Sequence, residues 1–314
     1  MDAKAKQQLS PRVGVSYPIT ENDVLHVTYG HYFQLPLLDY LYGNHGFDLR
    51  GAFKYVGNPD LKEEKTVAYE AGLEHGFNDY LKLSIVGYFK DVLNLTSYKK
   101  ETFGTGIYWL HTNSDYARIK GFELTLSQRT WHGFSGIITY TYQIARGRAS
   151  DAYQNFQDDY DNRKPRTEDF PLDWDQRHTA KVNVNYQIPD DWGPTIGKTH
   201  LLGDWDIDLF WNYGSGTPYT SSTSVPQPEL PPMNDKTFPA AWSLDMRVQK
   251  GLSIYKTYKA NLFAEITNLT NRANIINTVD VERYDLTGEP GGQFGDPTVY
   301  SNPRRILLGM EFVF

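Results

Sequence analysis

Apolar and polar residues alternate with a period of two over most of this chain. Between residues 180 and 188 the even positions are Ala, Val, Val, Tyr and Ile, whereas the odd positions are Lys, Asn, Asn and Gln. Because successive side chains of a strand point to opposite faces, such a run predicts a β-strand with one apolar and one polar face. The pattern predicts about eleven strands, over residues 12–17, 24–34, 65–76, 81–90, 116–129, 134–145, 180–188, 206–213, 242–249, 261–267 and 306–314.

The last predicted strand ends with the chain itself. Its even positions, Ile306, Leu308, Met310, Phe312 and Phe314, are all large and apolar, and the final residue is aromatic. A soluble protein rarely exposes such a row at its terminus, whereas the lipid-facing row of an outer-membrane barrel has this character. The end of the chain therefore favours an all-β fold, namely an antiparallel up-and-down transmembrane β-barrel.

Strand length and connection length point to the same fold. Most of the predicted strands are about ten residues long, which suits a tilted bilayer crossing better than a β-sandwich. Short and long connections alternate, as expected when turns gather at one membrane surface and loops at the other. The short connections are 18–23, 77–80, 130–133 and 252–257, the long ones are 35–64, 99–115, 146–176, 215–240 and 270–303, and 189–203 is intermediate.

Composition narrows the function classes. The chain has 314 residues and a formal net charge of −7, which argues against nucleic-acid binding. It contains no run of about 18 apolar residues, so transmembrane helices are excluded. Aromatic residues make up 15% of the chain, which suits the aromatic girdles of a barrel and also a carbohydrate-binding module. The absence of cysteine removes thiol catalysis, thiolate metal sites and disulfides.

Strand parity predicts that the chain is part of a larger barrel. If the C-terminus lies in the periplasm, every odd strand of eleven runs towards the periplasm, so the first strand begins at the cell surface. Bacterial single-chain barrels have even strand numbers, and eleven would be half of a 22-stranded barrel. Residues 1–8 lack the apolar segment of a signal peptide, although an outer-membrane protein must be exported. We therefore expect residues 1–314 to be the C-terminal portion of a longer protein.

Five short motifs, taken in order along the chain, resemble those of TonB-dependent receptors, the plugged 22-stranded transporters of the Gram-negative outer membrane. They are Gly-Asn-Pro-Asp-Leu-Lys-Glu-Glu at 57–64, with a strand containing Tyr-Glu-Ala-Gly-Leu at 69–73; Ala-Arg-Ile-Lys-Gly-Phe-Glu-Leu at 117–124; Trp-Asp-Gln-Arg-His-Thr at 174–179; Asn-Leu-Thr-Asn-Arg at 268–272; and Pro-Arg-Arg at 303–305. The first motif departs from the family pattern at Glu63, where a second proline is expected.

The resemblance implies a protein with an N-terminal plug, a TonB-contacting segment and active uptake of a large ligand, such as a siderophore, cobalamin, a glycan or a peptide. Nothing in these 314 residues corresponds to the plug, the TonB box or a signal peptide. The expected partners are outer-membrane lipid, an unknown extracellular ligand, and the TonB complex through the missing N-terminal part. No cofactor is implied.

Two groups of residues are candidate functional sites. Aromatic side chains in the predicted loops would stack on sugars or polycyclic ligands, although packing the loops together is the simpler role for them. Charged residues on the polar faces of the strands are expected to line the lumen. The loop aromatics are Tyr40, Tyr42, Tyr55, Trp109, Tyr153 and Tyr160, and the lumen-facing residues are Glu70, Glu74, Glu123, Lys181, Asp206, Asp208, Asp245, Arg247 and Glu265.

Other chemistry has weaker support. Hard cations prefer carboxylate oxygens, but the acidic loop at 146–176 has no EF-hand spacing and is interrupted by Arg163, Lys164 and Arg166. Asp175, Arg177 and His178 begin a strand, and no pair of carboxylates suggests a hydrolase. We therefore expect no enzyme, catalytic residue or metal site. The acidic residues of the loop are Asp151, Asp158, Asp159, Asp161, Glu168, Asp169, Asp173 and Asp175.

A soluble or surface-bound all-β module that binds carbohydrate or acts as an adhesin is the alternative. Such a module would bury the apolar rows at 81–85 and 182–186 between two sheets, whereas a barrel would present them to lipid. An eleven-stranded barrel wall has two unpaired edges, which hydrocarbon does not tolerate. Alone, the chain is therefore expected to form an open, strongly curved sheet, to aggregate, or to complete itself with another chain.

Overall fold

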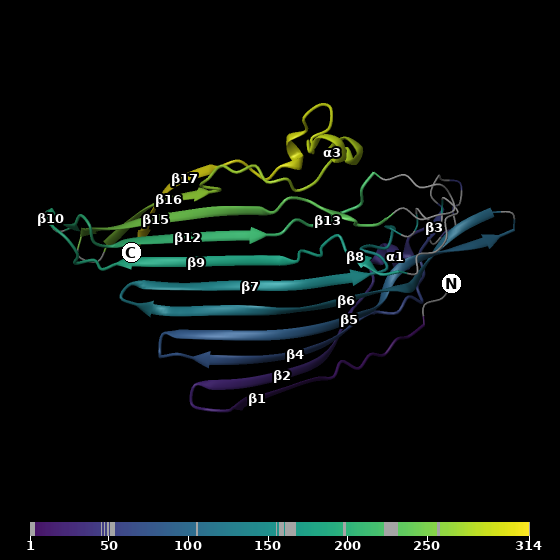
Figure 1. Cartoon of the computed structure of the whole chain (residues 1–314), viewed down its shortest axis with the longest axis horizontal. Coiled ribbons are helices and arrows are strands. Elements are labelled where there is room, and N and C mark those ends of the chain that lie inside the picture. Colours follow the sequence, from purple (N-terminus) through teal and green to yellow (C-terminus); the bar gives the residue numbers. More distant parts are fainter. Residues whose placement is uncertain are drawn as a thin grey trace.

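The computed structural model describes residues 4–44, 46, 48, 50, 54–104, 106–154, 156, 160, 168–196, 199–222, 232–255 and 258–313. An antiparallel sheet dominates it, and eleven strands of this sheet follow one another in chain order (Figure 1). All eleven predicted strands are present, several of them longer than expected. They are β1 (Arg12–Pro18), β2 (Asp23–Gln34), β4 (Glu64–Gly76), β5 (Leu81–Phe103), β6 (Gly106–Trp131), β7 (Phe134–Gly147), β9 (His178–Ile188), β12 (Trp205–Gly214), β15 (Ala241–Tyr255), β16 (Tyr258–Thr267) and β17 (Arg305–Val313).

The sheet is open. β1 and β17 lie at the two ends of the strand order, and each pairs with a single neighbour in the described chain. Figure 1 shows the strands stacked in one curved wall, with the short turns at one end and most of the long connections at the other. We call these the turn end and the loop end. The predicted open, curved sheet with an up-and-down topology is confirmed.

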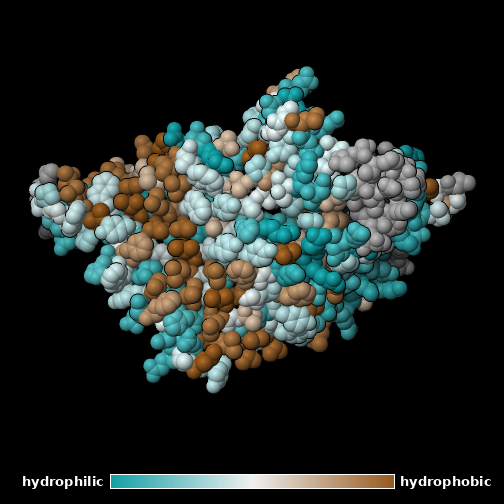
Figure 2. Space-filling view, in the orientation of Figure 1, coloured by the Kyte–Doolittle hydropathy of each residue, from teal (hydrophilic) through white to brown (hydrophobic). Residues whose placement is uncertain are grey.

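The strand register separates the side chains into an apolar face and a polar face. Leu73, Ile85, Leu124 and Tyr140 lie directly opposite one another across β4, β5, β6 and β7, and directly opposed residues share a face. The apolar face also carries the even positions of β17, where Leu308 is 75% exposed. Figure 2 shows hydrophobic side chains gathered over the turn-end half and middle of the wall, and hydrophilic ones towards the loop end.

No second sheet packs on this apolar face in the part of the chain that the structure describes. The two other sheets are small hairpins within single connections, β10 (Thr195–Ile196) with β11 (Thr199–His200) and β13 (Pro218–Tyr219) with β14 (Lys236–Thr237). Ile85 and Tyr186, which a sandwich would bury, are 43% and 44% exposed. The alternative of a soluble β-sandwich module is therefore wrong. No helix of the described chain is long and apolar enough to cross a bilayer.

The predicted long loop over residues 99–115 is also wrong. β5 continues to Phe103 and β6 begins at Gly106, so the two strands form a ribbon that extends past their neighbours at the loop end (Figure 1). The register shifts beyond Val92, and Asn94 adopts a left-handed backbone with φ 61°. Apolar and polar residues do not alternate regularly along the ribbon. Such alternation is expected only where one face of a strand contacts lipid, so it could not predict these two strand extensions.

Short elements occupy the other long connections. These elements are α1 (Leu38–Tyr42) and β3 (Tyr55–Val56) after β2, β8 (Phe170–Pro171) after β7, and α3 (Val281–Thr287) and the 3-10 helix η1 (Pro297–Val299) after β16. β3 pairs parallel with β6, and β8 pairs with β7. A small core of Ala117, Ala145, Phe170 and Leu172 lies where β6, β7 and β8 meet. The loop end therefore has an interior of its own.

Two glycines on the polar face let neighbouring strands carry aromatic rings close to the backbone. A Cβ on Gly121 would overlap the Tyr142 carbonyl oxygen and lie 2.7 Å from the Tyr88 hydroxyl oxygen. A Cβ on Gly309 would overlap the ring of Phe263. Since only glycine leaves this space, Tyr88 and Phe263 lie across the adjacent strand. This gives Gly121, in the second family-like motif, a physical role.

Candidate functional site

All nine residues predicted to line the lumen lie on the polar face of the wall. Glu70 and Glu74 on β4 lie opposite Tyr88 and Ser84 on β5, and the register continues this face across β6, β7, β9, β12, β15 and β16. The residues on this face are Glu70, Glu74, Glu123, Lys181, Asp206, Asp208, Asp245, Arg247 and Glu265. That this face encloses a lumen remains a prediction.

Ion pairs on the polar face are loose and partly exposed. Lys82 Nζ lies 3.2 Å from Glu74 Oε2, with half of the lysine side chain exposed. Arg247 Nη1 lies 3.7 Å from Glu265 Oε2, and both side chains are 41% exposed. Exposed pairs of this kind contribute about 0–1 kcal/mol each. The face is therefore a wet surface that changes partners at little cost.

A tighter hydrogen-bonded group lies near the turn end of the same face. Asp206 accepts hydrogen bonds from Asn185 Nδ2 at 2.6 Å and from Gln187 Nε2 at 3.1 Å. Asp208, one step along β12 on the same face, lies opposite Arg247 in the register. Amide donors and the guanidinium thus surround the two carboxylates, so this cluster has a structural explanation.

Five of the six predicted loop aromatics belong to one aromatic cluster at the loop end. Tyr40 stacks on His111 with ring centroids 4.9 Å apart, and Tyr55 meets His111 edge-on at 6.3 Å. Trp109 contacts Tyr160 at 5.8 Å, while Tyr153 contacts Tyr40 at 6.4 Å. The cluster, which we call the loop-end aromatic cluster, consists of Tyr40, Tyr55, Tyr98, Trp109, His111, Tyr153, Phe156 and Tyr160.

His111 is the centre of this cluster and was missed by sequence reasoning. Its side chain is fully buried, and Nδ1 lies 3.0 Å from the Val56 carbonyl oxygen, so Nδ1–H donates to that oxygen. Burial lowers the pKa of His111, partly offset by this hydrogen bond, and raises the pKa of the adjacent Tyr98. Tyr98 and His111 face each other across the ribbon, equidistant from its turn. Reading residues 98–111 as a hairpin that turns between Phe103 and Gly106 would have found the pair.

Members of the aromatic cluster differ in what they offer a ligand. Trp109 is only 6% exposed, so it packs the cluster rather than presenting a ring to solvent. Tyr153 and Tyr160 are 47% and 50% exposed. Tyr42, the sixth predicted aromatic, is half exposed and makes no ring contact with the cluster in the described chain. The ligand-binding role of these residues remains a prediction.

The first family-like motif joins the wall to the ribbon. Asn58 Nδ2 donates to the His111 carbonyl oxygen at 2.9 Å, and the Lys62 amide donates to Asn113 Oδ1 at 2.7 Å. Asn113 Nδ2 returns a hydrogen bond to the Lys62 carbonyl oxygen at 3.0 Å. Leu61 is buried, with 1% exposure. The motif therefore anchors the ribbon, which explains why asparagine and leucine occur at these positions.

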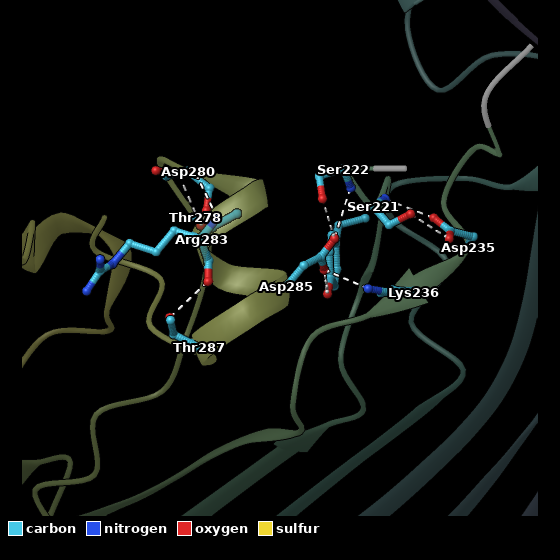
Figure 3. A network of polar contacts seen from close by, with 10 residues as sticks. Ser221, Ser222, Asp235, Lys236, Thr278, Asp280, Arg283, Asp285 and Thr287 are labelled. Atoms are coloured by element: carbon cyan, nitrogen blue, oxygen red, sulfur yellow. Dashed lines mark hydrogen bonds and ion pairs between the residues drawn. The ribbon is translucent and has the colours of Figure 1, made fainter. Parts of the chain in front are cut away.

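A second polar network links two different long connections (Figure 3). Asp285 on α3 accepts hydrogen bonds from the Ser222 amide at 2.9 Å and the Tyr219 hydroxyl at 3.0 Å. Lys236 Nζ lies 2.9 Å from the same carboxylate. The Lys236 contact and the Ser222 amide hold the pKa of Asp285 far below its usual range. The 215–240 and 268–304 connections are thus joined by one ionised side chain.

The third family-like motif is structural. Asp175 is 1% exposed and accepts hydrogen bonds from the Ala145 amide at 2.8 Å and from Arg177 Nε at 2.7 Å. Gln176 Nε2 donates to the Ser215 carbonyl oxygen at 2.9 Å. These bonds tie the start of β9 to β7 and to the connection after β12, so the side chains are committed to the fold.

The acidic loop does not assemble a cation site in the described residues. Asp173 accepts from Ser150 Oγ at 3.0 Å, and Asp169 accepts from the Tyr116 hydroxyl at 2.5 Å. Asp158, Asp159 and Asp161 lie outside the described residues. Among the residues that are described, no group of three or more His, Asp or Glu side chains is placed to hold a metal ion.

A single curved sheet with one exposed apolar face and one polar face is the wall of a transmembrane β-barrel. A family model described as TonB dependent receptor-like, beta-barrel, matches residues 2–269. The chain belongs to this family of TonB-dependent receptor barrels, which confirms the resemblance seen in the five motifs. Membership implies the outer membrane, and the family is one of receptors rather than enzymes.

Solved structures with the same fold are TonB-dependent receptors and related transporters. The outer-membrane transporter YddB of Escherichia coli has a TM-score of 0.68 and 14% identity, over 98% of this chain and 41% of that one. FpvA of Pseudomonas aeruginosa, bound to a pyoverdine–iron complex, has a TM-score of 0.59 and 14% identity, over 96% of this chain and 32% of that one. The copper transporter OprC has a TM-score of 0.57 and 17% identity, over 97% of this chain and 39% of that one.

The chain thus spans about a third to two-fifths of the length of these proteins. Identities below one in five support a shared fold and do not transfer a ligand.

Proposed function

We propose that this chain forms half of the wall of a TonB-dependent transporter in the outer membrane. The observation that supports the proposal best is the sheet whose two faces differ in polarity and carry no second sheet. An exposed apolar face of this extent is stable where lipid covers it. The polar face, with its nine charged residues, then lines the lumen.

Closing the wall requires an odd number of further strands. β1 and β17 run in the same direction, because they are the first and the eleventh in a row of antiparallel strands. A segment that pairs antiparallel with both edges therefore has an odd number of strands, and eleven more would give 22. We propose that an N-terminal portion supplies these strands together with the plug and the TonB box, so residues 1–314 are the C-terminal portion of the receptor.

In this arrangement the loop end lies at the cell surface and the C-terminus in the periplasm. The extracellular ligand approaches the loop end, where Tyr153 and Tyr160 expose about half of their surface. Stacking on such rings suits a polycyclic or sugar-containing ligand. An iron–pyoverdine complex and copper are the cargoes of two similar structures, which makes metal chelates the first class to test. Cobalamin, glycans and peptides are the other candidates.

Orientation is the first test. Residues 1–314 contain no cysteine, so a single cysteine introduced among them is the one thiol of this part of the receptor, and the receptor without it is the labelling control. We expect Phe103→Cys, at the 73% exposed tip of the ribbon, to react with an impermeant maleimide on intact cells. Asp79→Cys, in an exposed turn at the opposite end, should react only after permeabilisation. The reverse pattern would overturn the proposed orientation.

Uptake is the second test, made with the complete receptor that contains this chain. Cells with and without the receptor are compared for uptake of iron-55 pyoverdine, cobalt-57 cobalamin and labelled oligosaccharide, before and after TonB depletion. We expect receptor-dependent uptake that stops when TonB is depleted. Receptor-dependent uptake that continues without TonB would contradict the proposed mechanism.

A further inference from the structure

An aromatic row marks a membrane boundary on the apolar face of β2, β4 and β5. Tyr29, Tyr69 and Phe89 lie directly opposite one another, with ring centroids 5.1 and 6.4 Å apart. Tyr29 and Tyr69 are 36% and 48% exposed. Exposed tyrosines gather at the level of lipid headgroups in membrane barrels. This row therefore places the boundary on the loop-end side of the wall.

A row containing a lysine lies just beyond this boundary. Phe33, Lys65 and Leu93 are directly opposed on the same face, four residues closer to the loop end. Four residues of a strand span about 13 Å, or roughly 9 Å along the membrane normal for a strand tilted by about 45°. Lys65 therefore lies on the headgroup side of the aromatic row.

A pocket of about 410 Å³ opens at this level. Its lining includes the side chains of Phe33 and Lys65, together with the N-terminal segment and the segment after β3. Four lysines and two carboxylates border it, which leaves an excess of positive charge. These residues are Lys4, Lys6, Lys62 and Lys65 with Asp60 and Glu63. We call this feature the lysine pocket.

The charges of the lysine pocket are only partly neutralised. Lys4 Nζ lies 3.5 Å from Asp60 Oδ2. Lys6 Nζ donates to the carbonyl oxygens of Pro59, at 3.1 Å, and Leu61. Within the described residues, Lys6, Lys62 and Lys65 form no ion pair with a carboxylate. Carbonyl contacts hold the Lys6 ammonium in place and leave its full charge for an anion.

We infer that the lysine pocket binds a phosphate group of an outer-leaflet lipid headgroup. Lysine ammonium groups bind phosphate as point charges, and basic residues near a membrane surface attract anionic lipid. Phe33 and Leu93 flank Lys65 in the same row on the lipid-facing side, where the first carbons of the acyl chains would contact them. The inference rests on the proposed outer-membrane location with the loop end at the cell surface.

The test uses the complete receptor purified in detergent and native mass spectrometry. Diphosphorylated lipid A, the same lipid after enzymatic dephosphorylation, and inorganic phosphate are added as separate probes. The variant is Lys62→Gln with Lys65→Gln, and the matched control is Lys82→Gln with Lys90→Gln, two lysines on the polar face of β5. Heat-modifiable migration in gels confirms that each variant is folded.

We expect the diphosphorylated lipid to bind the unaltered receptor and the control equally. Binding by the pocket variant should fall roughly fivefold for each lysine removed. Equal binding of the dephosphorylated lipid, or no difference between the two double variants, would overturn the inference. Binding of inorganic phosphate that the lipid does not displace would identify a soluble-anion site and also overturn it. Maleimide labelling of Phe103→Cys on the same cells reports separately whether the proposed orientation holds.

Discussion

The middle of the wall and its loop end are stabilised in different ways. In the middle, apolar side chains such as Ile85 and Leu73 remain 43% and 40% exposed, because one layer of sheet has nothing to bury them. At the loop end, Leu61, Leu172 and His111 are at most 1% exposed. In the wall, lipid covers the apolar side chains, whereas at the loop end other segments of the same chain bury them.

This difference changes which substitutions matter. In the wall the hydrogen bonds are backbone ladders, so a side chain needs only to suit its face. At the loop end much of the backbone between the strands lies outside any ladder, and individual side chains such as Asn58, Asn113 and Asp285 satisfy its polar groups. Except at close contacts such as Gly121, polarity is thus the requirement in the wall, whereas residue identity is the requirement at the loop end.

The largest loss of stability is expected at Gly121, where atoms of the neighbouring strands occupy the space of a side chain. Gly121→Val would place a branched side chain against the Tyr142 carbonyl oxygen and the Tyr88 ring, so the strands must separate. Such overpacking costs about 3 kcal/mol or more, and we expect the receptor to lose its heat-modifiable folded form. Gly87→Ala is the control, because its Cβ meets nothing nearer than 4.0 Å. Equal folding of the two variants would show that the strands adapt.

The next effect compares neighbouring residues on opposite faces of β5. Ile85→Lys places a charge on the apolar face and should destabilise the receptor in lipid vesicles by about 2–4 kcal/mol. Ser84→Lys places the same charge on the polar face beside Glu74 and should change stability by less than about 0.5 kcal/mol. Denaturant titration in vesicles measures both. Similar losses of unfolding free energy for Ile85→Lys and Ser84→Lys would contradict the assignment of one face to lipid and the other to water.

At the loop end, Asp285→Asn should release α3 from the neighbouring connection. Losing charge-assisted hydrogen bonds should weaken local protection by about 1–3 kcal/mol, measured by hydrogen exchange at residues 281–287. The pKa of Asp285 is depressed in the fold, so its stabilisation is complete above the unfolded value of about 3.9 and is lost as pH falls below it. Exchange that is unchanged at neutral pH would contradict this link.

The loop-end aromatic cluster should respond to acid at a higher pH. His111 is buried and its pKa is lowered, so the unfolded form binds a proton first, below about pH 6.5. Stability of the ribbon should then fall by up to about 1.4 kcal/mol per pH unit down to the folded pKa. Hydrogen exchange of residues 96–113 between pH 7 and pH 5 measures this. In His111→Gln the same pH step should have little effect, whatever its starting stability.

The smallest effect is expected for the ion pairs of the polar face. Lys82→Gln breaks a contact in which half of the lysine is exposed, so stability should change by less than about 0.5 kcal/mol. The same denaturant titration measures it. A loss above about 2 kcal/mol would show that the polar face is drier than its exposure indicates.

The alternation rule predicted the wall well because lipid and water select opposite residues at successive positions. It placed all eleven strands and assigned Glu70, Lys181 and Arg247 to a common face. It failed over residues 99–115, where Trp109 and His111 pack in the loop-end aromatic cluster instead of facing lipid. The partners of His111 come from segments about 55 residues away, at Tyr55 and Val56, and no local pattern records such a pairing.

The family-like motifs indicated the family, which the alternation of apolar and polar residues does not, but they did not indicate the structural role of their residues. The Asn-Pro-Asp-Leu segment at 58–61 identified the family, yet nothing in its letters indicates that Asn58 bonds to the ribbon. Tyr42 and Trp109 looked alike as loop aromatics, although one is half exposed and the other is buried. Exposure depends on the arrangement of several connections, which a single sequence does not specify.

The rings of Tyr88 and Phe263 lie across glycines of the neighbouring strands, and this bears on the width of the proposed lumen. A ring that lies against its own wall narrows a channel by its thickness, whereas a ring that stands upright narrows it by its full length. Gly121 and Gly309 thus leave space in which the rings of Tyr88 and Phe263 lie flat against the wall and do not project into the lumen. The bore available to a plug or a cargo is set partly by two residues that have no side chain.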